Sequence, residues 1–389
     1  MKRLALHAVV LLTLSACTES TRPAAPPSPQ GDVALSVTAA CPTPANVVVH
    51  DEAGLLTALD AAYPGEVIGL DGFFGITADV TIATPGVTLT CATPGSGLFA
   101  IAGSGVQDML IASASHVVVD RLVLDGTQAG DSPYFAANDL ASYFAENIRF
   151  TNNSVTCSPG GECIFVAGGI GPVVSDNHFQ ATAPFSGIHL QADAEGIDGA
   201  RVERNTIVTT TPFVGFDFLA AIRVFNARNV VLADNTVAGP WANSLGPQGL
   251  SMSVITGNRV KGATLYGMQF SGNPNFPALL MLNNTLRSNV VTSAGTGGVF
   301  AKLACGNAFV GNSLQGNAGN IGLLFDATTG ANTLVGNGTI VIDNGAFDCN
   351  GDGVNDPNII TGAGAVTHGV TLGEVVSGAI RRVHGITLQ

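Results

Sequence analysis

One asparagine recurs along this chain inside a fixed apolar frame. An apolar residue stands three positions before it and, in most copies, another stands two positions after it. By subtraction, successive copies are 23 to 30 residues apart, and a period of about 20–50 residues is typical of a solenoid. The asparagines that fit the frame are Asn153, Asn177, Asn205, Asn235, Asn258, Asn284, Asn312 and Asn337.

The frame has a physical reason. Apolar residues at these positions predict short strands whose alternate side chains face one interior. Asparagine fits the bend between two strands, because it tolerates the left-handed conformation and can hydrogen-bond to its own backbone. When coils stack, each amide can donate to one neighbouring Asn and accept from the other. An unpaired buried amide costs about 1–3 kcal/mol, so a repeated ladder satisfies every copy. The alternative is a set of unrelated asparagines in surface turns.

This frame resembles that of the right-handed parallel β-helix repeat proteins, the architecture of pectate lyases and of many surface proteins. The resemblance covers residues 46–362 and implies an all-β fold, a right-handed parallel β-helix solenoid with an internal Asn ladder. Because a solenoid grows by adding coils, the 389 residues are expected to form one elongated domain. The fold carries lyases, hydrolases, epimerases, adhesins and inert spacers, so the resemblance is specific for fold and not for function.

Composition agrees with a continuous core and tight turns. Charged residues make up 11% of the chain, hydrophobic residues 46%, and glycine occurs 49 times, which argues against a disordered chain. The formal net charge of −13 argues against nucleic acid as a partner. It also gives no general attraction for polyanionic sugars, so such a substrate would need a local basic patch.

The start of the chain carries export signals. A basic start is followed by an apolar run over residues 4–14, which is too short to span a bilayer as a helix and predicts a secretory signal. The sequence Leu14-Ser15-Ala16-Cys17 resembles the bacterial lipoprotein box. This resemblance implies that residues 1–16 are removed and that Cys17 carries lipid. The alternative is an ordinary signal peptide cleaved near Ala16.

Lipid on Cys17 would anchor the protein to a membrane. Thr18 gives no inner-membrane retention signal of the Asp type, which by analogy favours the bacterial outer membrane or cell surface. Residues 17–45 are rich in proline and are expected to form an extended tether.

Both ends of the solenoid need covers, since exposed strand edges promote aggregation. Residues 51–62 predict a short N-terminal capping helix with Asp51 as its N-cap and a Pro-Gly stop behind it. Its apolar face would be Leu55, Leu56 and Leu59. The frame is lost after residue 362, and we treat residues 363–389 as a C-terminal tail or cap.

Six cysteines follow Cys17, and an exported chain in an oxidising compartment favours disulfides over metal binding. Six cysteines allow fifteen connectivities. Judged by neighbourhood along the coils, the expected pairs are Cys41–Cys91, Cys157–Cys163 and Cys305–Cys349.

A second set of strands lies between the ladder asparagines, and each has the pattern apolar, any residue, apolar. Side-chain alternation turns the middle residue, and the residue two positions further on, toward the outside. One outer face would therefore carry His189, Gln191, Arg223, Phe225, Gln269, Lys302 and Asp326 on coils about 4.8 Å apart.

The longest loops beside this face contain Phe213, Phe216, Phe218 and Trp241. Aromatic rings beside a polar strip suit a sugar-binding cleft, because the C–H faces of sugars stack on rings and their hydroxyls bind polar side chains. The alternative is a solvated sheet face with loop aromatics packed over it.

Related polysaccharide lyases place their catalytic residues on such a face. For this chain the resemblance implies that Arg223 or Lys302 neutralises a uronate and that His189 removes the C5 proton. The residues expected to bind substrate are Gln191, Phe225, Gln269, Asp326 and Trp241.

Other enzyme signatures are missing from the sequence. It lacks the Asn-Thr-Asp, Asp-Asp and Gly-His-Gly set of polygalacturonase-type hydrolases, and it has no Gly-x-Ser-x-Gly elbow. It also shows no outward carboxylate pair at the glycosidase spacing of about 5–10 Å. Two functions therefore stay open: a cell-surface lipoprotein that binds, and as a lyase or glycoside hydrolase cleaves, extracellular polysaccharide, or a non-catalytic surface scaffold or adhesin.

The residues 348–356 form the sharpest local motif. Asp348, Asn350 and Asp352 stand at positions 1, 3 and 5, Gly353 at position 6 and Asp356 at position 9, as at the start of a calcium loop. Position 12 is isoleucine, not the bidentate Glu of an EF-hand. The open interpretations are a weak calcium site and a polar capping turn that needs no ion.

Overall fold

The computed structural model describes residues 40–41, 44–136, 146–182, 184–192, 196–211, 219–272 and 279–369. The predicted signal peptide, Cys17, most of the tether and most of the C-terminal tail lie outside these residues. All the described residues belong to one compact unit, Val37–Gln389. None of the helices in these ranges is long and apolar enough to cross a membrane.

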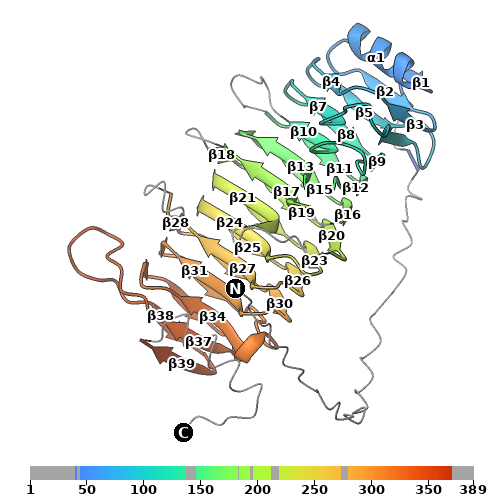
Figure 1. Cartoon of the computed structure of the whole chain (residues 1–389). Helices are drawn as coiled ribbons and strands as arrows, with labels where there is room; N and C mark the ends of the chain where they lie inside the picture. The colour runs from blue at the N-terminus through green and yellow to red at the C-terminus, as the bar shows by residue number, and fades with distance from the viewer. Residues whose placement is uncertain are drawn as a thin grey trace, which may run out of the picture. The chain divides into compact units, whose positions relative to one another are not determined.

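The unit is a right-handed parallel β-helix, as predicted, in which three parallel sheets run side by side along the coil axis (Figure 1). The first sheet contains β1 (Val47–Val49), β2 (Val67–Leu70), β5 (Thr88–Cys91), β8 (Val118–Asp120), β11 (Arg149–Thr151), β15 (Val173–Ser175), β19 (Arg201–Glu203), β22 (Val231–Ala233), β25 (Val254–Thr256), β29 (Thr285–Arg287), β33 (Ala308–Val310), β36 (Thr333–Val335) and β38 (Ile359–Thr361).

The second sheet follows the first along each coil. It contains β3 (Phe73–Ile76), β6 (Gly97–Ala100), β9 (Val123–Asp125), β12 (Ser154–Thr156), β16 (His178–Ala181), β20 (Thr206–Thr209), β23 (Thr236–Ala238), β26 (Arg259–Lys261) and β30 (Val290–Thr292).

The third sheet closes each coil. It contains β4 (Val80–Ile82), β7 (Leu110–Ala112), β10 (Tyr134–Ala136), β13 (Glu162–Ala167), β14 (Gly169–Ile170), β17 (Ser186–Gln191), β18 (Ile197–Asp198), β21 (Ala220–Arg228), β24 (Asn243–Ser251), β27 (Tyr266–Ser271), β28 (Met281–Leu282), β31 (Gly297–Lys302), β32 (Ala304–Cys305), β34 (Ile321–Phe325), β35 (Thr329–Gly330), β37 (Ile340–Asp343) and β39 (Ala365–His368). A short 3-10 helix, η1 (Ala318–Asn320), precedes β34.

The Asn ladder is present at the bend between the first and second sheets. Each side-chain amide Nδ2 donates to the Oδ1 of the Asn one coil further on, at N–O distances of 2.9–3.2 Å. The backbone N–H groups donate to the same oxygens, as Asn205 does to Asn235 at 3.0 Å. The ladder runs through Asn153, Asn177, Asn205, Asn235, Asn258, Asn289, Asn312 and Asn337.

One member of the predicted ladder was wrong. Asn258 donates to Asn289 and not to Asn284. Asn284 begins a second ladder at the bend between the third and first sheets, which continues through Asn307, Asn332 and Asn358. The sequence frame could not separate the two, because Leu286 stands both two residues after Asn284 and three residues before Asn289.

The left-handed residue of the bend is also not the one that the sequence predicted. The asparagines of the first ladder are not among the residues with positive φ, but the residue before each of them has a positive φ, as in Arg204 (55°) and Asp234 (54°). The preceding residue turns the chain, so the Asn side chain can point along the coil axis toward its neighbours.

Ala331, which precedes the ladder residue Asn332, has φ of 52°. A Cβ in this region costs about 1–2 kcal/mol. We therefore expect Ala331→Gly to raise the free energy of unfolding by roughly 1 kcal/mol, measured by chemical denaturation. The control is Ala308→Gly in β33, which should lower it by about 0.5–1 kcal/mol. Equal destabilisation by both substitutions would contradict the strain argument.

The N-terminal helix α1 (Glu52–Ala61) forms as predicted, and the Asp51 carboxylate accepts a hydrogen bond from the backbone N–H of Gly54 at 2.7 Å. Its buried face differs from the prediction. Leu55 is fully buried, but Leu56 is 42% exposed and so does not belong to the apolar face.

Leu122 takes the place of the ladder Asn in an early coil, and its N–H donates to Asn153 Oδ1 at 2.9 Å.

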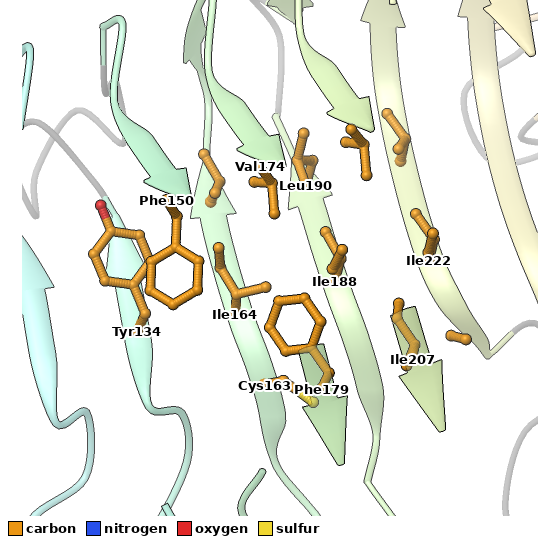
Figure 2. Close-up of a cluster of buried hydrophobic side chains, with 14 of the residues drawn as sticks. Tyr134, Phe150, Cys163, Ile164, Val174, Phe179, Ile188, Leu190, Ile207 and Ile222 are labelled. Atoms are coloured by element: carbon orange, nitrogen blue, oxygen red, sulfur yellow. The ribbon is translucent and has the colours of Figure 1, made fainter. Parts of the chain in front are cut away.

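Apolar side chains form one continuous hydrophobic core inside the coils, part of which is drawn in Figure 2. The Tyr134 and Phe150 rings lie 4.7 Å apart between centroids, and the Phe150 and Phe179 rings lie 6.3 Å apart in a stacked arrangement. The structure contains three disulfides in the expected pairing, Cys41–Cys91, Cys157–Cys163 and Cys305–Cys349.

Candidate functional site

The outer face of the third sheet holds the predicted residues in register. His189 of β17 lies opposite Phe165 of β13 on one side and Arg223 of β21 on the other. Ile188 and Leu190 point into the core beside it (Figure 2), so His189 faces outward. A second row, two residues further on, contains Gln191, Phe225, Gln248, Ser271 and Lys302.

The structure separates the predicted catalytic trio. Arg223 lies one coil from His189, which corresponds to about 4.8 Å between strands. Lys302 lies three coils beyond Arg223, at roughly 14 Å, because β24 and β27 come between β21 and β31. β24 lacks the apolar-x-apolar pattern of its neighbours, because its Leu245-Gly246-Pro247 stretch resembles a turn. His189 and Arg223 therefore share a site, and Lys302 belongs to another part of the face.

Several predicted surface residues are buried. Trp241 is only 2% exposed and packs in the main core, and Phe225 is 8% exposed. These rings therefore do not present a free surface for stacking on a sugar. The predicted loop aromatics Phe213, Phe216 and Phe218 lie outside the described residues.

His189 itself is 4% exposed, and its Nδ1 is hydrogen-bonded to Oε1 of Glu162, the first residue of β13. Cys163 and Ile164 both pack in the core, so alternation is broken at the start of β13 and Glu162 reaches this side. A Cβ on Gly187 would meet core Ile207 at 3.0 Å, so residues 187 and 188 both face inward. Ser186, and Glu162 in register with it, then face outward with His189.

Glu162 and Ser186 were missed by the sequence analysis. Neither belongs to the apolar-x-apolar pattern that defined the outer strip, and period-2 alternation assigns both to the interior. The alternation is broken at this point, because a Cβ on Gly187 would meet the core residue Ile207.

The Glu162 carboxylate affects the pKa values of two charged groups around the Glu162–His189 pair. Burial lowers the pKa of the Arg223 guanidinium, and the nearby Glu162 carboxylate opposes that shift. Burial also raises the pKa of Asp131, which precedes β10, and the Glu162 charge raises it further. The site thus combines two carboxylates, an imidazole and a guanidinium within neighbouring coils.

Two aromatic rings extend the site along the coil axis. Phe135 of β10 and Phe165 of β13 stack with centroids 5.4 Å apart and an interplanar angle of 10°. The Phe165 ring meets His189 edge-on at 4.9 Å. Both phenylalanines are only partly buried, so an apolar platform adjoins the charged groups.

The remaining predicted binding residues have structural partners. Gln269 Oε1 accepts a hydrogen bond from Asn243 Nδ2 at 2.9 Å. Asp326 Oδ1 accepts from the N–H of Thr328 at 2.8 Å and from its hydroxyl at 2.5 Å, so this carboxylate stabilises a turn. Gln191 is partly buried in the second row.

The predicted calcium loop is exposed and internally hydrogen-bonded. The Asp348 carboxylate accepts from the backbone N–H groups of Gly353 and Gly351, both at 2.7 Å, and these donors lower its pKa. Asn350 and Asp352 accept from N–H groups two residues further on, and Asp356 accepts from Cys349 N–H. Each of these four side chains therefore already accepts a hydrogen bond from a backbone N–H group of the same loop.

A family model described as NosD, periplasmic copper-binding protein, matches residues 146–346, more than half of the chain. No curated protein matches the sequence.

Three solved structures are similar in architecture. An alginate lyase from Paenibacillus sp. str. FPU-7 has 14% identity and a TM-score of 0.45, covering 83% of this chain and 97% of that one. A mannuronan C-5 epimerase A-module from Azotobacter vinelandii has 13% identity and a TM-score of 0.49, covering 83% and 94%. An alpha-1,3-glucanase catalytic unit from Streptomyces thermodiastaticus has 14% identity and a TM-score of 0.49, covering 90% and 72%. At these values the likenesses support no argument about substrate or reaction.

Proposed function

The chain belongs to the NosD family, described as periplasmic copper-binding proteins, and we propose that it is an exported protein that binds polysaccharide on the outer face of its third sheet. The binding site would centre on β10, β13, β17 and β21. Three disulfides support export, since such bonds persist in oxidising compartments.

One observation carries the proposal: the partly exposed Phe135–Phe165 platform adjoins Arg223 and the Glu162–His189 pair. A sugar presents an apolar C–H face and a polar rim, and an aromatic platform beside charged groups matches both. Arg223 is the cation of this cluster and would pair with an acidic sugar through its planar fork of donors.

Copper does not fit the described residues. They contain no group of three or more His, Cys, Asp or Glu side chains able to hold a metal ion. Thiolate, thioether and imidazole are the ligands that copper prefers, but all six described cysteines are in disulfides. The His189 Nδ1 is bonded to Glu162. We therefore assign copper no role at this site.

The test is binding to immobilised alginate, polygalacturonate and dextran, with assays for new reducing ends and double bonds. We expect Arg223→Ala and Phe165→Ala each to weaken binding about tenfold or more. Arg259→Ala, an exposed arginine on β26 of the second sheet, is the matched control and should bind normally. If none of the three sugars binds, or if both site variants bind as well as the parent protein, the proposal is refuted. New chain ends or double bonds would show cleavage in addition to binding.

We further propose that lipid on Cys17 anchors the protein to the outer membrane, as the lipoprotein box implies. Replacing Cys17 with Ser should release the protein from the membrane fraction. A parent protein that takes up no radiolabelled fatty acid would contradict the anchor.

Calcium binding by residues 348–356 stays a prediction. If the site exists, millimolar calcium should raise the melting temperature by a few degrees, because binding to the folded state adds stability. EDTA should reverse the shift, and Asp352→Asn should abolish it. A melting temperature that neither calcium nor EDTA changes would leave the loop as a capping turn.

A further inference from the structure

His189 has one ring nitrogen occupied and the other unsatisfied. Nδ1 is bonded to Glu162, whereas the buried Nε2 has no hydrogen-bond partner in the described part of the chain. Leaving a buried acceptor unpaired costs about 1–3 kcal/mol, so such atoms are rare in folded proteins and need an explanation. A polar ligand group that reaches Nε2 would supply one.

A second unsatisfied atom lies on the same strand. Ser186 is fully buried, and its Oγ has no partner among the described residues. Ser186 lies opposite Glu162 in the neighbouring strand, and Glu162 is the residue that bonds His189. The outer face of β17 thus holds an unpaired nitrogen and an unpaired hydroxyl three residues apart.

The ionisation of Glu162 determines what Nε2 can do. The charged groups around the imidazole are Glu162 on β13, Arg223 on β21 and Asp131 before β10. An ionised carboxylate such as that of Glu162 only accepts hydrogen bonds. Nδ1 must then carry the proton. In the neutral ring this leaves Nε2 as a bare acceptor.

We propose that Glu162 is a positioning residue that keeps the proton of His189 on Nδ1, so that Nε2 and the Ser186 hydroxyl together bind one hydroxyl group of a saccharide. A sugar hydroxyl can donate to Nε2 and accept from Ser186 at the same time. An ionised carboxylate cannot donate to Nε2, so this position selects a hydroxyl. The inference rests on the proposed function and names the sugar group that the site recognises.

The tautomer is measured without sugar, on full-length protein labelled with 15N-histidine. Long-range 1H–15N correlation spectra distinguish the two neutral tautomers, and His189→Gln assigns the signal. We expect the parent ring to be protonated on Nδ1 alone. In Glu162→Gln the amide can donate to Nδ1 instead, which should move the proton to Nε2. Glu162→Asp, which keeps the carboxylate, should restore the parent pattern at least in part.

The hydroxyl contact is measured separately, by titration with oligosaccharides of alginate, polygalacturonate and dextran. Ser186→Ala should weaken binding of the preferred oligosaccharide about tenfold and leave the tautomer unchanged. The control is Ser313→Ala, at an exposed serine after β33, which should change neither the affinity nor the tautomer.

Different outcomes contradict different claims. A proton on Nε2 in the parent protein, or an unchanged tautomer in a folded Glu162→Gln, overturns the role of Glu162 even if sugar binds. If Glu162→Gln does not fold, the parent spectrum still decides. Normal affinity in Ser186→Ala overturns the hydroxyl site and leaves the proposed function standing. If no oligosaccharide binds, the proposed function fails and the saccharide assignment fails with it, whatever the tautomer.

Discussion

Replacing Asn235 with Ala is expected to lower the free energy of unfolding by about 2–5 kcal/mol. Asn235 Oδ1 accepts from both the backbone N–H and the Nδ2 of Asn205, at 3.0 Å each. Its Nδ2 donates to Val202 O at 2.8 Å and to Asn258 Oδ1 at 2.9 Å. The residue is fully buried, so water cannot replace these bonds.

The Asn235→Ala variant loses unequal numbers of hydrogen bonds toward the two neighbouring coils. In the variant the backbone N–H of residue 235 can still donate to Asn258 Oδ1, as it does at 3.0 Å in the parent protein. On the other side, two donors of Asn205 lose their acceptor. Amide hydrogen exchange should therefore accelerate more around Asn205 than around Asn258, because neighbouring coils depend on one another in a solenoid.

Thr236→Ala is the matched control for this prediction. Thr236 is the next residue along the chain, and its side chain is exposed on β23. Its removal should change the midpoint of urea unfolding little, within about 0.5 kcal/mol. If Asn235→Ala were as mild as Thr236→Ala, the ladder would not contribute measurably to the stability of the β-helix.

Truncating Phe179 to Ala should lower the free energy of unfolding by about 3–5 kcal/mol. The side chain is fully buried on β16 and stacks on Phe150 inside the coils (Figure 2). The surrounding residues are held by backbone hydrogen bonds to the coils on both sides, so they cannot collapse freely into the cavity. The measurement is the midpoint of chemical denaturation, with tyrosine and tryptophan fluorescence as separate probes.

Phe73→Ala is the comparison on the outside of the β-helix. Phe73 on β3 is 46% exposed and contacts Phe99 at a centroid distance of 5.2 Å. We expect a loss of about 1 kcal/mol or less. Similar losses for Phe73→Ala and Phe179→Ala would mean that the interior of the coils packs no better than their surface.

The repeated frame predicted the fold because it records a constraint that acts on every coil. Asn205 and Asn235 stand between apolar residues that face one core, and each amide is hydrogen-bonded to a copy of itself one coil away. The assignment failed at Asn284, where two asparagines five residues apart fit the same frame. Asn289 continues the first ladder because it follows a strand of the first sheet, β29, whereas Asn284 follows a strand of the third sheet, β28.

The site was only partly predictable. Alternation placed His189 and Arg223 on the outer face, and their register confirms that they are neighbours. It did not show that His189 is 4% exposed or that Glu162 is its partner. Both depend on how side chains of neighbouring coils pack, and the usual alternation is broken at Gly187, where a Cβ would meet the core. Neither leaves a periodic signal in the sequence.

The sequence by itself determined the coil architecture, the Asn ladder and the capping helix of this protein. These features arise from local rules that repeat along the chain: apolar alternation, amide pairing and helix capping. The tertiary structure alone decided which polar groups meet, bringing Glu162 to His189 and keeping Lys302 away from Arg223. The physical reason is that stacking converts sequence distance into a number of coils, and each coil between two residues moves their side chains apart by about 4.8 Å along the axis.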